Sequence, residues 1–279
     1  MKTWNTSGRH LLSLLLWMIG SVYFSGGAYL WGQTKYYGVW DRSFMKERLW
    51  LDASWDSFEK KWKELSGKGF RLVDLEIRTR GGQERYYGVF HASVKPYRLK
   101  VGITGDDLLK EVEAARKENL RIIDIEVFKR GGAYLYAGVW LEAKEDRKVV
   151  LALNKDAFQE TWKKMNADGY RLVDIETYVD EGERRYAAIF RRGTEAYRLW
   201  MGVSWDCFKT IRRELEWQGF NLVDFETYRT TTGLQLYIGA WLESKSSQKV
   251  YFGVSRQKFV GKWEAIGKDN FWLSDLEIY

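Results

Sequence analysis

Gly69-Phe70-Arg71-Leu72-Val73-Asp74-Leu75-Glu76 is the first of five similar segments, each with a glycine or asparagine, an apolar strand-like run and an Asp-x-Glu ending. The later segments cover residues 119–126, 169–176, 219–226 and 270–277, so the spacing is 50, 50, 50 and then 51 residues. A fixed period of this length is typical of repeat proteins, in which each unit buries its apolar face against its neighbours. The sequence therefore predicts a single repeat domain in residues 29–279.

Residues 54–103 illustrate the predicted unit, which begins with a helix. Ser54 and Asp56 favour a helix start because their side chains accept hydrogen bonds from free backbone N–H groups. Phe58 lies at helical spacing from other apolar residues, and Gly69 is expected to end the helix because glycine readily takes a left-handed conformation. Three strands are expected to follow, over residues 70–77, 85–90 and 97–103.

Alternation along these strands predicts two faces. The apolar face, expected to lie under the helix of the same unit, consists of Val73, Leu75, Ile77, Val89, Leu99, Val101 and Ile103. The opposite face consists of Asp74, Glu76, Tyr86, Gly88, Phe90, Arg98 and Lys100. The predicted fold class is therefore an α/β repeat protein of αβββ units, at residues 54–103, 104–153, 154–203 and 204–254.

A fifth unit is predicted to combine the two ends of the chain. Residues 255–279 contain a helix and one strand, whereas residues 35–40 match the second strand and residues 48–51 match the third. Joining residues 255–279 with residues 29–53 would close a pseudo-fivefold ring, similar in outline to α/β propellers, which leaves no exposed sheet edge. An open solenoid is the alternative.

The first 28 residues have the parts of a secretory signal. Lys2 and Arg9 precede a short apolar run at residues 11–19, and small residues follow it. A membrane anchor through residues 11–24, if they are not cleaved, and a degenerate first repeat are the alternatives. We therefore expect a secreted or extracytoplasmic protein, with a cytoplasmic one as the alternative.

The composition restricts the possible functions. A formal charge of +7, from 45 basic and 38 acidic residues, permits an anionic partner without requiring one. A single cysteine, Cys207, excludes an internal disulfide framework, and two histidines leave little for zinc sites or histidine-dependent catalysis. No catalytic residue, metal or cofactor is predicted, and the sequence does not define an oligomeric state.

Two segments of the third unit carry a resemblance to a known family. They are Gly169-Tyr170-Arg171-Leu172-Val173-Asp174-Ile175-Glu176-Thr177-Tyr178 and Arg185-Tyr186-Ala187-Ala188-Ile189-Phe190. The chain resembles the bacterial tandem repeat domain family, whose repeats are similar to those N-terminal to secreted serine hydrolases of the polyglycine hydrolase type. The resemblance covers residues 29–279 and implies an extracytoplasmic binding or scaffolding module. It implies no catalytic residue.

The Asp-x-Glu pairs are the first candidate site. Carboxylates that share one strand face are able to bind a hard cation such as Ca²⁺, but every unit also offers a tyrosine and a cation to the face predicted for them. The favoured interpretation is a structural polar network that satisfies its own hydrogen bonds. Its predicted members are Asp74, Glu76, Asp124, Glu126, Asp174, Glu176, Asp224, Glu226, Asp275, Glu277, Arg98 and Arg198.

Aromatic residues on the same predicted face are the candidates for ligand binding, since apolar rings beside polar groups suit a sugar or a peptide. They are Trp40, Trp140, Phe190, Trp200, Trp241, Tyr86, Tyr136, Tyr186 and Tyr237. An equal alternative is that these side chains fill the middle of the ring formed by the units.

The predicted function is a noncatalytic binding or scaffolding module that recognises an extracellular glycan or peptide. It would use the aromatic, charged sheet face or the loops at one rim. One alternative is a hydrolase that uses a carboxylate pair as acid and base in a diverged unit, such as the second, where Val150 replaces Lys100. Another is a scaffold that binds an anionic polymer through basic loops near Arg80, Arg130 and Arg184, although nucleic acid is not the favoured partner.

Overall fold

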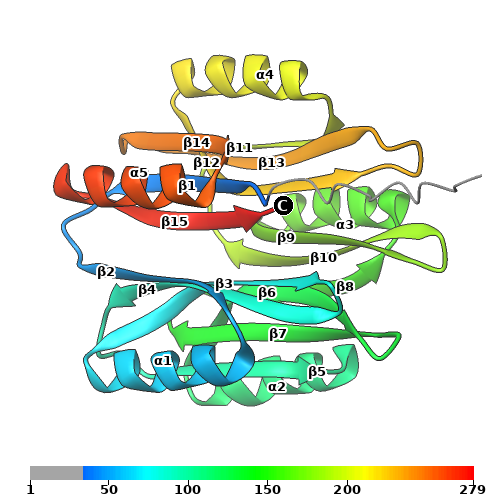
Figure 1. The fold of residues 1–279 in the computed structure, drawn as a ribbon. Coiled ribbons are helices and arrows are strands. Elements are labelled where there is room, and N and C mark those ends of the chain that lie inside the picture. The colour runs from blue at the N-terminus through cyan, green and yellow to red at the C-terminus, as the bar shows by residue number, and fades with distance from the viewer. Residues whose placement is uncertain (1–33) are drawn as a thin grey trace, which may run out of the picture. The chain divides into compact units, whose positions relative to one another are not determined.

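The computed structural model describes residues 34–279, which form one compact unit. The predicted signal or anchor at residues 1–28 lies outside the described residues. Residues 34–279 contain five similar units, each with one helix and one three-stranded antiparallel sheet. Figure 1 shows α4 at one side and α1 and α2 at the opposite side, with strands between them. The helices are α1 (Trp55–Gly67), α2 (Gly105–Lys117), α3 (Lys155–Ala167), α4 (Trp205–Trp217) and α5 (Arg256–Lys268).

The sheets are built alike, with the second strand of each hairpin in the middle. The first sheet is β2 (Glu47–Ala53), β4 (Gln83–Ala92) and β3 (Phe70–Arg80), and the second is β5 (Tyr97–Ile103), β7 (Ala133–Glu142) and β6 (Leu120–Arg130). The third is β8 (Arg147–Leu153), β10 (Glu183–Arg192) and β9 (Tyr170–Asp180). The fourth is β11 (Tyr197–Val203), β13 (Gln235–Glu243) and β12 (Phe220–Arg229).

The strand that follows each hairpin joins the sheet of the next unit. β5 pairs with β7, for example, and Val101 lies opposite Ala137. The structural unit is therefore βαββ, and the prediction that residues 97–103 share a sheet with residues 70–90 was wrong. The physical reason is that β4 is already flanked by β3 and β2, so its two edges are occupied when the chain reaches Tyr97.

The fifth sheet combines the two ends of the described chain. Its strands are β14 (Gln248–Val254), β1 (Tyr36–Arg42) and β15 (Phe271–Ile278), with β1 in the middle. The predicted match of residues 35–40 to a second strand is confirmed by this pairing, in which Val39 lies opposite both Val250 and Asp275. Residues 48–51 lie in β2 and belong to the first sheet.

A β-bulge changes which residues face the helix. Leu72 pairs with Phe90 and Asp74 pairs with Val89, so Val73 is an extra residue in β3. As a result Leu72 and Phe90 join Phe58 of α1 in one buried cluster, whereas Val89 packs in a cluster of the adjacent composite unit. The predicted places of Val73 and Val89 under the helix were therefore wrong, while those of Leu75 and Ile77 are confirmed.

The loops after the hairpins gather at the C-terminal ends of the helices. In every unit the backbone N–H of the first loop residue donates to the carbonyl of the residue that ends the helix. The pairs are Ser93 with Gly69, Ala143 with Asn119, Gly193 with Gly169, Ser244 with Gly219 and Ser43 with Asn270. We call this edge of the molecule the helix-end rim. None of the helices in residues 34–279 has both the length and the apolarity needed to cross a bilayer.

Candidate functional site

The Asp-x-Glu residues of all five units form a buried cluster, which we call the carboxylate core. It consists of Asp74, Asp124, Asp174, Asp224, Asp275, Glu76, Glu126, Glu176, Glu226 and Glu277. Three of the Asp and all five Glu side chains are 8% exposed or less. In a strand, residues two apart point to the same side, so each Asp and its Glu face the same way. One oxygen from each of Glu76, Glu126 and Glu176 lies within 4.8 Å of the other two.

Backbone N–H groups of neighbouring units provide hydrogen bonds to this core. Ile125 N donates to Asp174 Oδ2 at 3.0 Å, and Ile77 N donates to Glu126 Oε2 at 3.2 Å. The same pattern joins the last unit to the first, because Leu276 N donates to Asp74 Oδ2 at 2.9 Å. Ile278 N likewise donates to Glu76 Oε2 at 3.2 Å. We call the first strand of each hairpin, β3, β6, β9, β12 and β15, the inner strand of its unit. The carboxylates therefore link adjacent inner strands.

Burial raises the pKa of every member of the core, because the charged form of a carboxyl group is disfavoured away from water. The pKa of Asp174 rises to about 7 and that of Glu226 to about 8. Repulsion by neighbouring carboxylates adds to burial in raising the pKa of Glu176, and Glu126 and Glu226 contribute most of it. The core is thus partly protonated near neutral pH unless positive charge reaches it.

Arg78 is the residue that breaks the repeat at this place. Its guanidinium binds both carboxylate oxygens of Glu277, at 2.7 and 2.8 Å, and lies 3.0 Å from Glu76. The equivalent positions hold aromatic residues, which are Phe128, Tyr178, Tyr228 and Tyr279. Sequence reasoning did not single out this role, although the exchange of an aromatic residue for a cation was visible in the repeat.

The predicted network of carboxylates, tyrosines and cations within each unit was wrong. Arg98 binds Glu111 and Glu118 of the adjacent helix region instead, the latter at 2.7 Å. Arg198 lies 4.7 Å from the centre of the Phe220 ring. These cations project toward the helices because β5 and its equivalents belong to the next sheet, and the carboxylate core lies on the other side.

The predicted ligand-binding aromatics are almost all buried. Trp40, Trp140, Phe190, Trp241, Tyr86, Tyr136, Tyr186 and Tyr237 are 7% exposed or less. Their rings pack under the helices. The ring centres of Tyr86 and Phe58 are 5.7 Å apart, and those of Trp241 and Phe208 are 5.5 Å apart. Their assignment to the carboxylate face was wrong, because the bulge places strand two in the opposite phase. Trp200, at 44% exposed, is the one of the nine that offers its ring to solvent.

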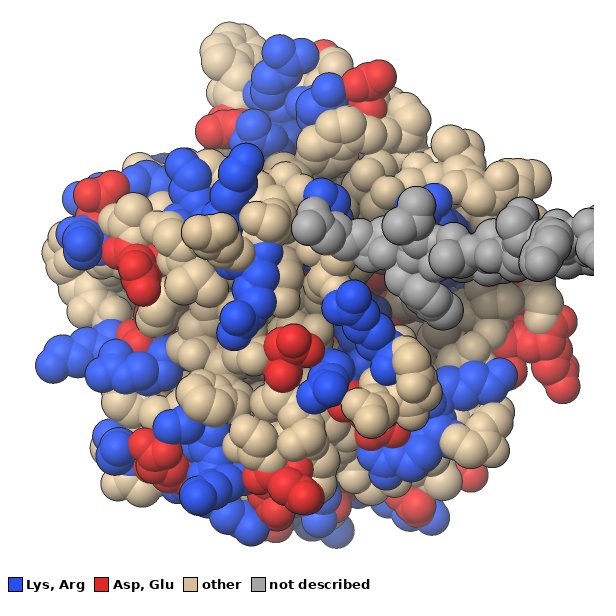
Figure 2. All heavy atoms as spheres, in the orientation of Figure 1, with Lys and Arg blue, Asp and Glu red and all other residues tan. Residues whose placement is uncertain are grey.

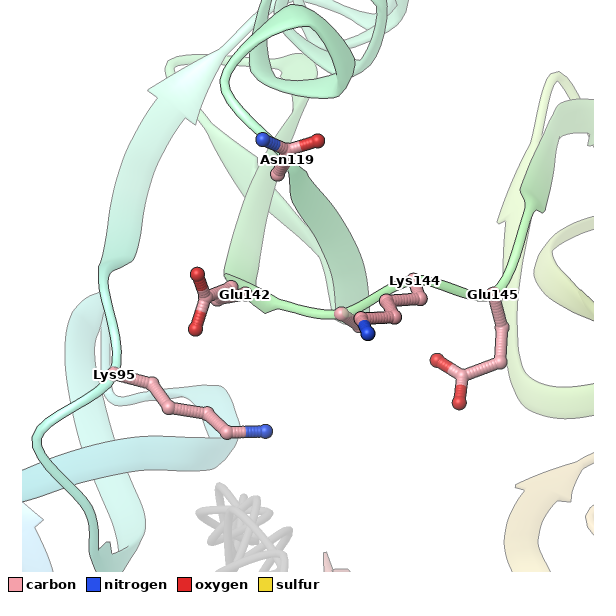
Figure 3. Close-up of a pocket in the computed structure, with 6 residues that line it drawn as sticks. Lys95, Asn119, Glu142, Lys144 and Glu145 are labelled. Carbon is pink, nitrogen blue, oxygen red and sulfur yellow. The ribbon is translucent and has the colours of Figure 1, made fainter.

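The helix-end rim carries open hollows at successive units, and their walls combine charged side chains with a larger share of apolar surface. One hollow of about 600 Å³ is lined by Lys95, Asn119 and the loop of residues 142–145. Figure 3 shows Lys95, Glu142, Lys144 and Glu145 extending toward the same open space. A second, of about 620 Å³, is lined by residues 144–146, Gly169 and residues 192–195. Lys144 and Glu145 line both, so the two hollows are neighbours.

Trp217 adds an exposed aromatic ring to this rim, and sequence reasoning missed it. It is 88% exposed at the last turn of α4, and the residue before it, Glu216, helps to line a third hollow with Gly219 and residues 244–248. The signal was available, since the equivalent positions are Gly67, Lys117, Ala167 and Lys268. A large exposed ring at one position of a repeat is not explained by packing.

The basic loops at the opposite edge are largely paired within the molecule. Arg130 binds both carboxylate oxygens of Glu84 at 2.7 Å. The Arg184 guanidinium lies 3.7 Å from the centre of the Tyr228 ring. Figure 2 shows basic and acidic side chains interspersed over the visible face. This arrangement gives little support to the alternative of an anionic polymer as partner.

The five similar units and their period of about 50 residues make this an α/β tandem-repeat protein. The model of a family described as "Polyglycine hydrolase-like, structural repeat" matches residues 50–93, 95–143 and 151–193. Three of the units therefore belong to this family of polyglycine hydrolase-like structural repeats, which confirms the resemblance found in the sequence. The matched segments follow the βαββ units of the structure, which cover residues 47–92, 97–142 and 147–192. A search of curated proteins found no match.

Proposed function

We propose that the chain is a noncatalytic binding scaffold whose five units close into a ring and whose helix-end rim recognises an extracellular glycan or peptide. The observation that carries the proposal is the pair of adjacent hollows on this rim, whose walls carry charged side chains, together with the exposed ring of Trp217 at the end of α4 on the same rim. Polar groups that converge near an exposed aromatic ring suit ligands with both hydroxyl or amide groups and apolar faces.

Contacts between the first and last units support closure of the ring. Glu47 Oε2 accepts a hydrogen bond from Leu273 N at 2.8 Å, and His91 Nε2 lies 2.9 Å from Leu273 O. The His91 ring also stacks on Trp272, with 4.2 Å between ring centres. The backbone bonds from Leu276 and Ile278 to carboxylates of the first unit add to these contacts between the first and last units.

The rim suits an extended ligand because its hollows repeat. Lys144 and Glu145 stand between two hollows, so a polymer with a regular spacing of polar groups would contact them and both neighbouring loops. Linked sites of this kind raise the overall affinity without new chemistry, since the second contact becomes intramolecular. Both charges are present in each hollow, and this favours a neutral or zwitterionic ligand.

Glycan and peptide arrays probed with the secreted protein test this proposal. We expect a set of related hits, and we expect Trp217→Ala and Lys144→Ala each to weaken binding at least about tenfold. Trp200→Ala is the matched control, because Trp200 is an exposed aromatic residue of the same unit that lies in strand β11. Binding that depends on Trp200 and not on Trp217 would place the ligand on the strand surface, and an absence of hits on both arrays would contradict the proposal.

A further inference from the structure

The carboxylate core contains a set of oxygens with the spacing of a metal site. Glu76, Glu126 and Glu176 come from the inner strands of three successive units, and they are 5%, 1% and 6% exposed. One oxygen of each lies within 4.8 Å of the others. Ca²⁺ binds oxygen at about 2.3–2.6 Å, so two oxygens on one ion lie at most about 5 Å apart. The three carboxylates therefore match the geometry of oxygens that share a single ion.

An unpartnered aspartate oxygen provides an independent indication of missing positive charge. Asp74 is 7% exposed, and its Oδ1 has no hydrogen-bond partner within the described part of the chain, whereas its Oδ2 accepts from Leu276 N. Asp74 lies two residues before Glu76 on β3, so its side chain points into the same interior. A buried carboxylate oxygen without a donor is costly, and a cation or a proton is needed to compensate it.

The basic groups near the core do not supply enough charge. Arg78 is the guanidinium that binds the Glu residues, and it contacts Glu277 and Glu76 rather than Glu126 or Glu176. Arg147 stays charged near neutral pH, although burial lowers its pKa to about 10, but it acts on Asp174, and no ion pair within residues 34–279 joins it to Glu126 or Glu176. The Arg78 side chain contacts Glu76 and Glu277 and is 31% exposed, so the core is nearest to solvent along this side chain.

We propose that Glu76, Glu126 and Glu176 bind a hard divalent cation, Ca²⁺ or one of similar oxygen preference, in the interior between the units. Because the three ligands come from three units, an ion there would also tie those units together. The proposal does not depend on the helix-end rim.

Thermal unfolding and direct titration of the chelator-treated protein near neutral pH test the proposal. We expect Ca²⁺ to raise the midpoint of unfolding, and we expect Tb³⁺, a luminescent substitute for Ca²⁺, to be sensitised by the tryptophans. The Glu126→Gln variant should bind at least about tenfold more weakly. Glu142→Gln, at the exposed rim, is the matched control and should bind as the unchanged protein does.

Two results would overturn the proposal. The first is no effect of Ca²⁺, Mg²⁺, Mn²⁺ or Tb³⁺ on the unchanged protein up to about 10 mM, well above the dissociation constants of weak extracellular Ca²⁺ sites. The second is equal binding by the unchanged protein and by Glu126→Gln, which would assign the ion to the surface. If Glu126→Gln does not fold, Glu176→Gln replaces it, and the titration of the unchanged protein decides in either case.

Discussion

Gly88 lies where α1 comes closest to its sheet. A Cβ atom at this position would lie 2.9 Å from Phe58 Cε2 and 2.9 Å from Leu72 Cδ1, which is closer than such atoms pack. We therefore expect Gly88→Ala to lower the free energy of unfolding by about 1–3 kcal/mol, because the core must shift to admit the methyl group. Chemical denaturation measures this loss.

The third unit provides the control for this prediction, since Ala188 occupies the equivalent position and is fully buried. Ala188→Gly should cost less than Gly88→Ala, because it removes a methyl group instead of forcing one into contact. Equal stability of Gly88→Ala and the unchanged protein would show that Phe58 yields without cost.

Glu47 makes the contact between the first and last units dependent on pH. Burial raises its pKa from 4.5 to about 7, so the folded state holds a proton that the unfolded state releases. The contribution of protonated Glu47 to the free energy of unfolding is fully present below pH 4.5 and is lost as the pH rises through about 7. His91 does not titrate in this window, because burial lowers its pKa to about 4.

We therefore expect Glu47→Gln to stabilise the protein above pH 7 by up to roughly 3 kcal/mol and to change little below pH 4.5. The chain already uses this solution elsewhere: Gln248, the equivalent residue, binds both the N–H and the carbonyl of Leu222. Unfolding followed across this pH range measures the difference. A constant difference between the two proteins at all pH values would contradict the shifted pKa.

At the scale of elements, the helix starts differ in one hydrogen bond. Asn154 Oδ1 accepts from Ala157 N at 2.9 Å, whereas Ser54 makes no such bond at the start of α1. Asn154→Ala should thus cost about 1 kcal/mol, and Ser54→Ala only a few tenths. Denaturation of the two variants side by side checks this. Equal losses would mean that the Ser54 hydroxyl caps α1 in solution.

The sequence predicted the elements well and their arrangement less well. The helix starts follow from local residue preferences and the composite unit follows from the repeat, so both were recognisable. The bulge at Val73 was not, because one extra residue in a strand leaves no mark in an apolar run such as residues 70–77. It reverses the phase of β4 against β3, and for this reason the aromatics were predicted on the carboxylate face.

The same limit applies to the candidate site. The Asp-x-Glu pairs were recognised as unusual, but their partners were sought within one unit. Their hydrogen bonds come from backbone groups of the next unit, as in the bond from Leu276 to Asp74, and a period in the sequence does not reveal which strands become neighbours. The exposed Trp217 was not predicted because the other units have no aromatic residue at this position, so the repeat gives no expectation for it.

At the scale of the whole molecule, β1 joins the two ends of the described chain. It lies between β14 and β15, so its removal would leave both without a partner. We expect a chain that starts at Ser43 to lose cooperative unfolding and its near-ultraviolet circular dichroism. A chain that starts at Thr34 is the control and should retain both. Cooperative unfolding of the shorter chain would favour the open solenoid over the ring.

The meeting of Lys35 and Tyr279 has one more consequence. The two residues exchange backbone hydrogen bonds, at 2.5 and 2.9 Å, as opposite residues of a hairpin do. The fifth hairpin thus differs from the first mainly in lacking its turn, residues 79–84. In a chain of residues 35–279, a linker with the sequence of those residues would make the backbone circular, and the opening would then be movable to any of the other four hairpins. Nothing in the pairing of the described strands requires the opening to lie at this hairpin, so a family of circular permutants of residues 35–279 should share this fold.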